Sequence, residues 1–110
     1  MRPFPSSLRE PIVAYRANLR AVFGDRLRDV RLFGSFARGE ADEDSDVDVL
    51  VLVDGLSESE RGIAIGAVAD VIVQTGLPLS PLALSTERFE ALRASGRALA
   101  RDIDEQGIPL

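Results

Sequence analysis

Apolar residues recur at helical spacing near the amino terminus and at closer spacing further along the chain. The first pattern predicts a helix that begins at Ser7 or Glu10 and ends at Phe23. Ser7 with Glu10 fits a capping box, whereas Pro11 favours the later start. The residues on the apolar face of this helix are Leu8, Ile12, Tyr15, Leu19, Val22 and Phe23.

Two apolar runs on either side of an acidic loop predict strands. The first is Val30–Phe33, with Leu27 as an alternative start. The second begins with two acids and alternates valines at 47, 49, 51 and 53 with Asp46, Asp48, Leu50 and Leu52. Because this run is apolar on both faces except at its beginning, it predicts a strand in the middle of a sheet.

The segment after the second strand predicts a long helix and then a third strand. Ser57 and Glu60 form a capping-box signature, and a glycine ends the helix near Thr75. The third strand, Leu79–Leu84, contains Pro81, which favours an edge position or a bulge.

Two short helices are expected to close the chain, over Thr86–Ser95 and Arg97–Glu105, with Gly107 and Pro109 as terminators. The predicted order is helix, strand, turn, strand, helix, strand, helix, helix. A chain of 110 residues is long enough for one modest core, so we expect a single domain over residues 1–110.

Composition limits the function mainly through the residue types that the chain lacks. With no cysteine, disulfides and thiolate metal sites are excluded, and a cytoplasmic location is expected. With no histidine, a serine–histidine triad and a histidine-ligated zinc site are excluded. No run approaches the ~20 apolar residues of a membrane span, and the first residues lack the apolar stretch of a secretion signal. We therefore expect no membrane association.

Charge is concentrated in one loop. The net charge of −5 argues against direct nucleic-acid binding, which relies on a basic face. Six of the nine residues in Glu40–Asp48 are acidic, and Glu40–Asp44 are expected to form a solvated loop. All 13 basic residues are arginine, so any phosphate clamp must use arginine or backbone N–H groups.

Asp46 and Asp48 are the candidate metal ligands. Alternation along a strand puts their side chains on one face, roughly 7 Å apart. Two carboxylates so placed can share one or two hard cations that bridge to substrate phosphates. Two charges at the start of a valine-rich buried strand also carry a desolvation cost, which needs a functional reason.

Gly34 and Ser35 are the candidate phosphate cradle. Glycine permits a tight turn and a close approach of the backbone. A short helix beginning at Ser35 would aim its N–H groups at a phosphate, and the serine hydroxyl adds a donor. Arg38, one turn further on, could point at the same anion or could be an ordinary surface arginine.

Three other motifs are excluded by the residues present in this stretch. Gly34–Gly39 has the glycine spacing of a P-loop, but Glu40 stands where lysine is required. Acids at 42, 44, 46 and 48 suggest a calcium loop, but valine occupies the position that needs glycine. A dinucleotide fingerprint would need a third glycine after the first two, and the stretch has none.

Gly34-Ser35, ten intervening residues and then Asp46-Val47-Asp48 resemble the nucleotidyltransferase signature of the DNA polymerase β superfamily. The fuller string GSFARG…DSDVDVLV, in so short a chain, looks like the minimal nucleotidyltransferase domains of prokaryotes. The resemblance covers roughly Phe23 to Leu110. It implies an α+β fold, a small mixed β-sheet with flanking helices.

The resemblance also implies a reaction, a site and a partner. The reaction is a Mg²⁺-dependent attack on the α-phosphate of a nucleoside triphosphate, with ATP as the expected substrate and pyrophosphate released. Asp46 and Asp48 would be the catalytic metal ligands, and Gly34 and Ser35 would hold the triphosphate. Such domains are often encoded beside a HEPN-domain protein, and several act as the antitoxin of a toxin–antitoxin pair, some by adenylylating the HEPN toxin. We therefore expect a HEPN-type partner, or a second subunit, to supply the acceptor pocket.

The chain departs from this pattern in the third strand. Active members commonly place a third carboxylate there, which ligates metal and acts as a base. No acid occurs in Leu77–Thr86, where Ser80 or Leu82 stands near the expected position, and Glu87 begins the next helix.

Two hypotheses remain from the sequence. The chain is a working nucleotidyltransferase that moves AMP to a hydroxyl of a partner protein, or it is an inactive module that neutralises a partner by binding alone. Transfer to a small molecule such as an aminoglycoside is disfavoured, because those enzymes need an extra domain for the acceptor.

Overall fold

A four-stranded mixed sheet forms the centre of the computed structural model, which describes residues 6–41 and 45–109, with side chains from residue 9 onward. The strand order is β3-β2-β1-β4. β2 runs parallel to β3 and antiparallel to β1, and β1 runs antiparallel to β4. The strands are β1 (Leu27–Phe33), β2 (Val47–Val53), β3 (Leu79–Ser85) and β4 (Ile108–Pro109).

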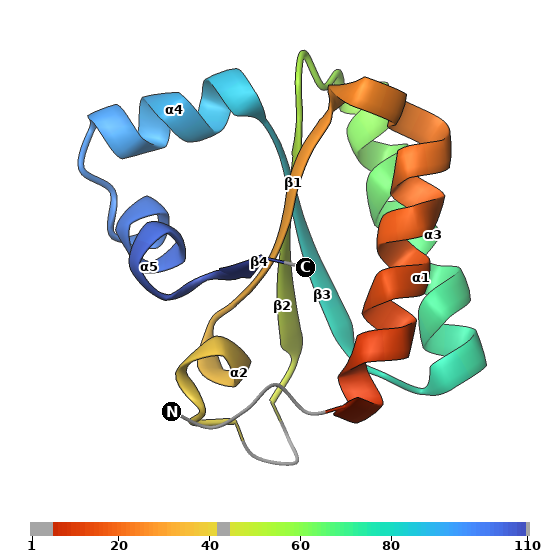
Figure 1. The fold of residues 1–110 in the computed structure, drawn as a ribbon. Coiled ribbons are helices and arrows are strands. Elements are labelled where there is room, and N and C mark those ends of the chain that lie inside the picture. The colour runs from red at the N-terminus through yellow and green to blue at the C-terminus, as the bar shows by residue number, and fades with distance from the viewer. Residues whose placement is uncertain (1–5, 42–44, 110) are drawn as a thin grey trace.

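Helices cover both faces of this sheet (Figure 1). α1 (Ser6–Phe23) and α3 (Glu58–Thr75) lie on one face, and α4 (Thr86–Ala94) and α5 (Ala98–Gln106) lie on the other. α2 (Ser35–Arg38) is a single turn that follows β1, and the 3₁₀ helix η1 (Gly24–Arg26) joins α1 to β1. Among the described helices, none combines the length and the apolar character that crossing a membrane requires.

β2 is the buried middle strand of the sheet, as its sequence predicts. Its valines pack in the core cluster with α1 and α3, whereas Leu50 and Leu52 pack with Phe89 and Ile103 from α4 and α5. Asp48 is the one residue of β2 that is not fully buried. The strand is therefore anchored on both faces and carries a single polar side chain near its amino end.

The predicted boundaries are confirmed for most elements. β1 begins at Leu27, the earlier of its two predicted starts. The capping box of α3 is present: the Ser57 hydroxyl accepts from the Glu60 N–H, and the Glu60 carboxylate accepts from the Ser57 N–H. β3 lies at the edge of the sheet, where the missing N–H of Pro81 is tolerated.

Two details near the ends of the chain differ from the prediction. α1 begins at Ser6, one residue before the earlier of its two predicted starts, so Ser7 lies inside the helix. Pro11 also lies inside the helix, where its missing N–H forfeits one bond of the ladder, and α1 continues through it. α5 ends before Gly107 and Pro109, as predicted, but Ile108 and Pro109 form β4, a strand that the sequence did not predict, and pair with β1 at an edge where proline is permitted. The predicted solvated loop at 40–44 falls largely on residues 42–44, outside the described residues.

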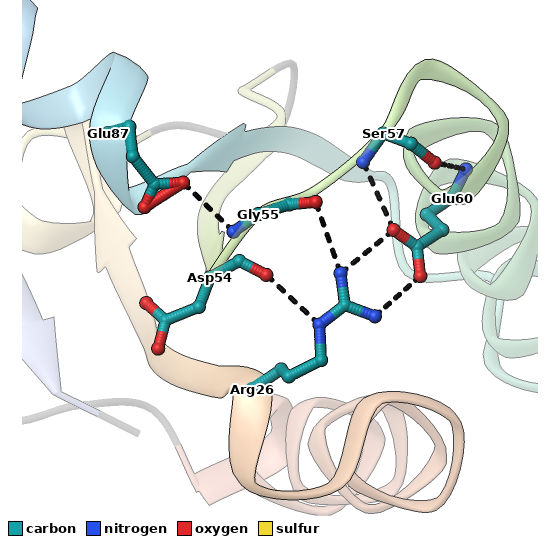
Figure 2. A network of polar contacts seen from close by, with 6 residues as sticks. All are labelled: Arg26, Asp54, Gly55, Ser57, Glu60 and Glu87. Atoms are coloured by element: carbon teal, nitrogen blue, oxygen red, sulfur yellow. Dashed lines mark hydrogen bonds and ion pairs between the residues drawn. The ribbon is translucent and has the colours of Figure 1, made fainter.

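A polar network closes the carboxyl end of β2 (Figure 2). The Arg26 guanidinium donates to the carbonyl oxygens of Asp54 and Gly55 at 3.0 and 3.2 Å, and to both Glu60 oxygens at 2.6 and 2.9 Å. The Glu87 carboxylate accepts from the Gly55 N–H at 2.9 Å. These bonds tie the turn after β2 to both helical layers, and those from Arg26 and Ser57 lower the pKa of Glu60 to about 2.

Candidate nucleotide and metal site

Gly34 and Asp48 meet near the amino end of β2. Phe33, the last residue of β1, pairs with Asp48 across the antiparallel ladder, and Gly34 then turns the chain into α2. Gly34 has a φ of +73°, which residues with a side chain rarely adopt. A Cβ atom at this position would also collide with Oδ2 of Asp48. The backbone angle therefore favours glycine, and any side chain at this position would also push the Asp48 carboxylate aside.

Ser35 begins α2, as the sequence predicts. The N–H of Arg38 donates to the Gly34 carbonyl, and the N–H of Glu40 donates to the Ser35 carbonyl. Gly39, in the left-handed conformation, ends the turn. These bonds hold the glycine–serine turn beside the amino end of β2, and its role in binding a phosphate stays a prediction.

Asp46 and Asp48, the carboxylate pair, differ in their surroundings. β2 begins at Val47, so Asp46 immediately precedes the strand and is exposed, whereas Asp48 lies within the strand and is half-buried. Burial raises the pKa of Asp48, and the charge of Asp46 raises it further, while Arg38 acts in the opposite direction. In the described part of the chain, no hydrogen bond contributes to stabilising the Asp48 charge. Among the described residues, the negative charge of Asp48 is therefore only partly compensated.

The carboxylate pair fits a hard divalent cation that shares its coordination with a substrate. Carboxylate oxygens are ligands that Mg²⁺ takes in proteins, and Mg²⁺ commonly binds through one or two of them together with water and phosphates. Within residues 6–41 and 45–109 there is no cluster of three or more His, Cys, Asp or Glu residues that could hold a metal. The described residues therefore provide an open two-carboxylate site and not an all-protein cage.

Ser80 occupies the position on β3 nearest in register to Asp48. The two residues are partners in the parallel ladder between β2 and β3, whereas Leu82 pairs with Leu50 and packs in the core beside α4 and α5. The sequence left Ser80 and Leu82 as alternatives for the missing third carboxylate, and the strand register favours Ser80. A serine hydroxyl cannot take up a proton at neutral pH, so β3 supplies no base next to Asp48.

Arg38 makes contacts that the sequence did not predict. Its Nε donates to Glu40 at 3.0 Å, and its Nη1 lies 3.4 Å from Oδ2 of Asp102 on α5. Asp102 is the site neighbour that sequence reasoning missed, since 64 residues separate it from Arg38 and no local pattern spans that distance. Because Arg38 also acts on the pKa of Asp48, it belongs to the surroundings of the carboxylate pair. Whether it contacts a nucleotide stays a prediction.

Comparison with known proteins defines the class of this fold and site. A model of the nucleotidyltransferase domain family matches residues 17–94, and the chain belongs to that family. A solved protein assigned as a minimal nucleotidyltransferase is 30% identical, with a TM-score of 0.63 over 94% of this chain and 93% of that chain. The expected fold, a small mixed sheet with flanking helices, is therefore confirmed.

More particular relatives are similar over shorter stretches or at lower identity. Protein adenylyltransferase MntA of Thermococcus cleftensis is 52% identical over 40 residues, which are 36% of this chain and 38% of that protein. The chain spans only 38% to 44% of the length of the curated relatives that it matches. A toxin–antitoxin complex solved with AMP-PNP contains a chain that is 21% identical, with a TM-score of 0.56 over 87% of this chain and 69% of that chain. At that identity the likeness establishes the fold alone.

Proposed function

We propose that this chain is a Mg²⁺-dependent nucleotidyltransferase that moves a nucleoside monophosphate, AMP from ATP, onto a hydroxyl of a partner protein. The observation that carries the proposal is the Asp48 carboxylate lying against the backbone of Gly34. That contact gathers the glycine–serine turn and the carboxylate pair at one point, next to the amino end of β2. The activity in the name of the similar MntA protein supports a protein as the acceptor.

In the proposed reaction, the acceptor oxygen forms a bond to the α-phosphorus while the bond to the pyrophosphate oxygen breaks. Gly34 and Ser35 hold the triphosphate with backbone N–H groups and the hydroxyl. Asp46 and Asp48 would hold Mg²⁺, which would offset the charge of the phosphates. The acceptor proton leaves to water or to a base of the acceptor protein, because Ser80 cannot accept it.

The proposed partner is a HEPN-type protein whose toxicity this chain suppresses as an antitoxin. The toxin–antitoxin pairing named for one structural neighbour supports a protein partner, and the HEPN type is what the sequence resemblance implies. The partner would also supply the acceptor pocket, and a second copy of this chain is the alternative source of one.

A labelling experiment tests the proposed transfer. The protein is incubated with Mg²⁺, ATP labelled on the α-phosphate and the protein encoded beside it. Label should pass to that neighbour with the wild type and with Asp70→Asn, which changes an exposed acid on α3. It should not pass with Asp48→Asn or after chelation of the metal. Equal labelling by Asp48→Asn would contradict the proposal.

The second candidate function is neutralisation of the partner by binding alone, and the serine opposite Asp48 favours it. In that case the double variant Asp46→Ala, Asp48→Ala should bind and inhibit the partner as well as the wild type does. Affinity can be measured by calorimetry and inhibition by growth of cells that express the partner. If inhibition is lost while affinity is preserved, the binding-only function is excluded.

A further inference from the structure

We propose that Asp102 is a positioning residue, which orients Arg38 toward the nucleoside triphosphate and so sets the affinity of the site for it. This inference rests on the proposed function and adds a residue to it. Asp102 lies on α5, beyond residues 17–94 that the family model matches. It is therefore a feature of this chain outside the segment by which the family is recognised.

The guanidinium of Arg38 is held by two acids from different parts of the fold. Nε donates to Glu40 at 3.0 Å, and Nη1 lies 3.5 and 3.4 Å from the two carboxylate oxygens of Asp102. The side chains of Arg38 and Asp102 are 32% and 30% exposed, so the pair is partly exposed. Within residues 9–41 and 45–109, Nη2 has no hydrogen-bond acceptor. A guanidinium Nη2 carries two donors, and such donors suit a phosphate oxygen.

Arg38 lies in the turn that holds Gly34 beside the carboxylate pair. Its N–H donates to the Gly34 carbonyl at 3.2 Å, and Gly34 lies against the Asp48 carboxylate. Arg38 and Glu40 also line a hollow of about 570 Å³ between α2 and the end of α5, together with residues 105–109. A ligand therefore has room beside the guanidinium.

The contact with Asp102 on α5 matters because α2 is a single turn and cannot by itself fix the side chain of Arg38. A free arginine side chain samples many rotamers, and fixing it costs free energy when a ligand binds. An ion pair that keeps the guanidinium oriented before binding removes part of that cost. Partly exposed ion pairs contribute little to stability, so orientation is the effect that the Arg38–Asp102 contact is best suited to produce.

Binding of ATP with Mg²⁺, measured by calorimetry, tests this role. Asp102→Asn should weaken the affinity roughly two- to tenfold, the ordering cost of one long side chain. Asp102→Glu keeps the negative charge and should therefore retain part of the ATP affinity that Asp102→Asn loses. In an Arg38→Ala background, Asp102→Asn should have no further effect. In the transfer assay, Asp102→Asn should raise the KM for ATP with a smaller change in kcat.

A matched variant on α5 separates orientation from general effects. Asp104→Asn removes a carboxylate from the same helix and breaks a different ion pair, with Arg93. It should not weaken ATP binding, because the Asp104 carboxylate pairs with Arg93 and not with Arg38. If Asp102→Asn matches Asp104→Asn, or keeps its effect without Arg38, the positioning role is wrong and the proposed function still stands. Absence of ATP binding to the wild type would overturn both together.

Discussion

The two ends of β2 each carry an aspartate, and the surroundings of the two residues are opposite. At the carboxyl end, Asp54 accepts from the Thr86 hydroxyl at 2.7 Å and from Arg28 Nε at 2.6 Å. These bonds, that from Thr86 foremost, lower the pKa of Asp54. Near the amino end, burial and the charge of Asp46 raise the pKa of Asp48.

The difference distinguishes Asp54, an aspartate that stabilises the fold, from Asp48, a candidate ligand-binding aspartate. Asp54 sits in a network whose donors are all supplied by the chain, so its charge is satisfied once the chain folds. Asp48 has an acidic neighbour and receives only a partial offset from Arg38, so the described residues do not fully satisfy its charge. Acids perturbed in this second way concentrate at functional sites, and here the comparison picks out the amino end of β2.

The largest effect is expected from changing each aspartate to asparagine. Asp48→Asn should lower the transfer rate about a hundredfold or more, because it removes a metal ligand. Its melting temperature should stay the same or rise, since a poorly compensated charge is removed. Asp54→Asn should do the reverse, with a lower melting temperature and retained transfer. A lower melting temperature for Asp48→Asn would show that the Asp48 charge stabilises the fold, as that of Asp54 does.

Gly34→Ala is expected to disable the site through the backbone. The positive φ should cost about 1–3 kcal/mol of stability, and the added Cβ should displace the Asp48 carboxylate. Gly24→Ala is the matched control, because Gly24 also has a positive φ but open space around its Cβ position. Both variants should lose stability in urea unfolding, and only Gly34→Ala should lose ATP binding. Equal loss of binding would show that strain alone matters.

Arg26→Ala should weaken the fold at the opposite end of β2. It leaves the Glu60 carboxylate and the carbonyls of Asp54 and Gly55 without their guanidinium donor. Thermal unfolding followed by circular dichroism should show a lower melting temperature. Added salt should change the melting temperature of the variant less than that of the wild type, because the variant lacks the Arg26–Glu60 ion pair. ATP affinity below the transition should match the wild type, and a loss of affinity would show that the two ends are coupled.

The smallest effect is expected in the acid dependence of stability. Hydrogen bonds from Arg26, and then from the Ser57 N–H, lower the pKa of Glu60 from 4.5 to about 2. The folded state therefore binds this proton less readily than the unfolded state, and stability is lost as the pH falls from 4.5 toward 2. Urea unfolding of Glu60→Gln should show a flatter pH profile in this range.

Asp48 should contribute with the opposite sign in the same experiment. Its pKa is raised above 3.8 in the folded state, so lowering the pH through that raised value favours folding. Asp48→Asn should remove this gain and leave the Glu60 loss in place. If Glu60→Gln and Asp48→Asn change the pH dependence of stability with the same sign, the two ends of β2 do not differ in this way.

Local patterns in the sequence were sufficient for the elements and for the family. The alternating valines of β2 and the capping box at Ser57 depend on neighbouring residues only, and the structure contains both. The spacing from Gly34 to Asp48 identified the nucleotidyltransferase signature, which the family comparison confirms. The roles of Gly34, Ser35, Arg38, Asp46 and Asp48 in binding and catalysis stay predictions.

Contacts between distant segments were decided only by the tertiary structure. The collision that requires glycine at 34 depends on the register between β1 and β2, and the choice of Ser80 over Leu82 depends on the register between β2 and β3. The pairing of Arg38 with Asp102 depends on how α5 packs. Registers and helix positions follow from the packing of the whole core, and the periodicity of a single segment does not contain them. The sequence alone therefore determined which residues could form a site, and the packing determined which of them meet.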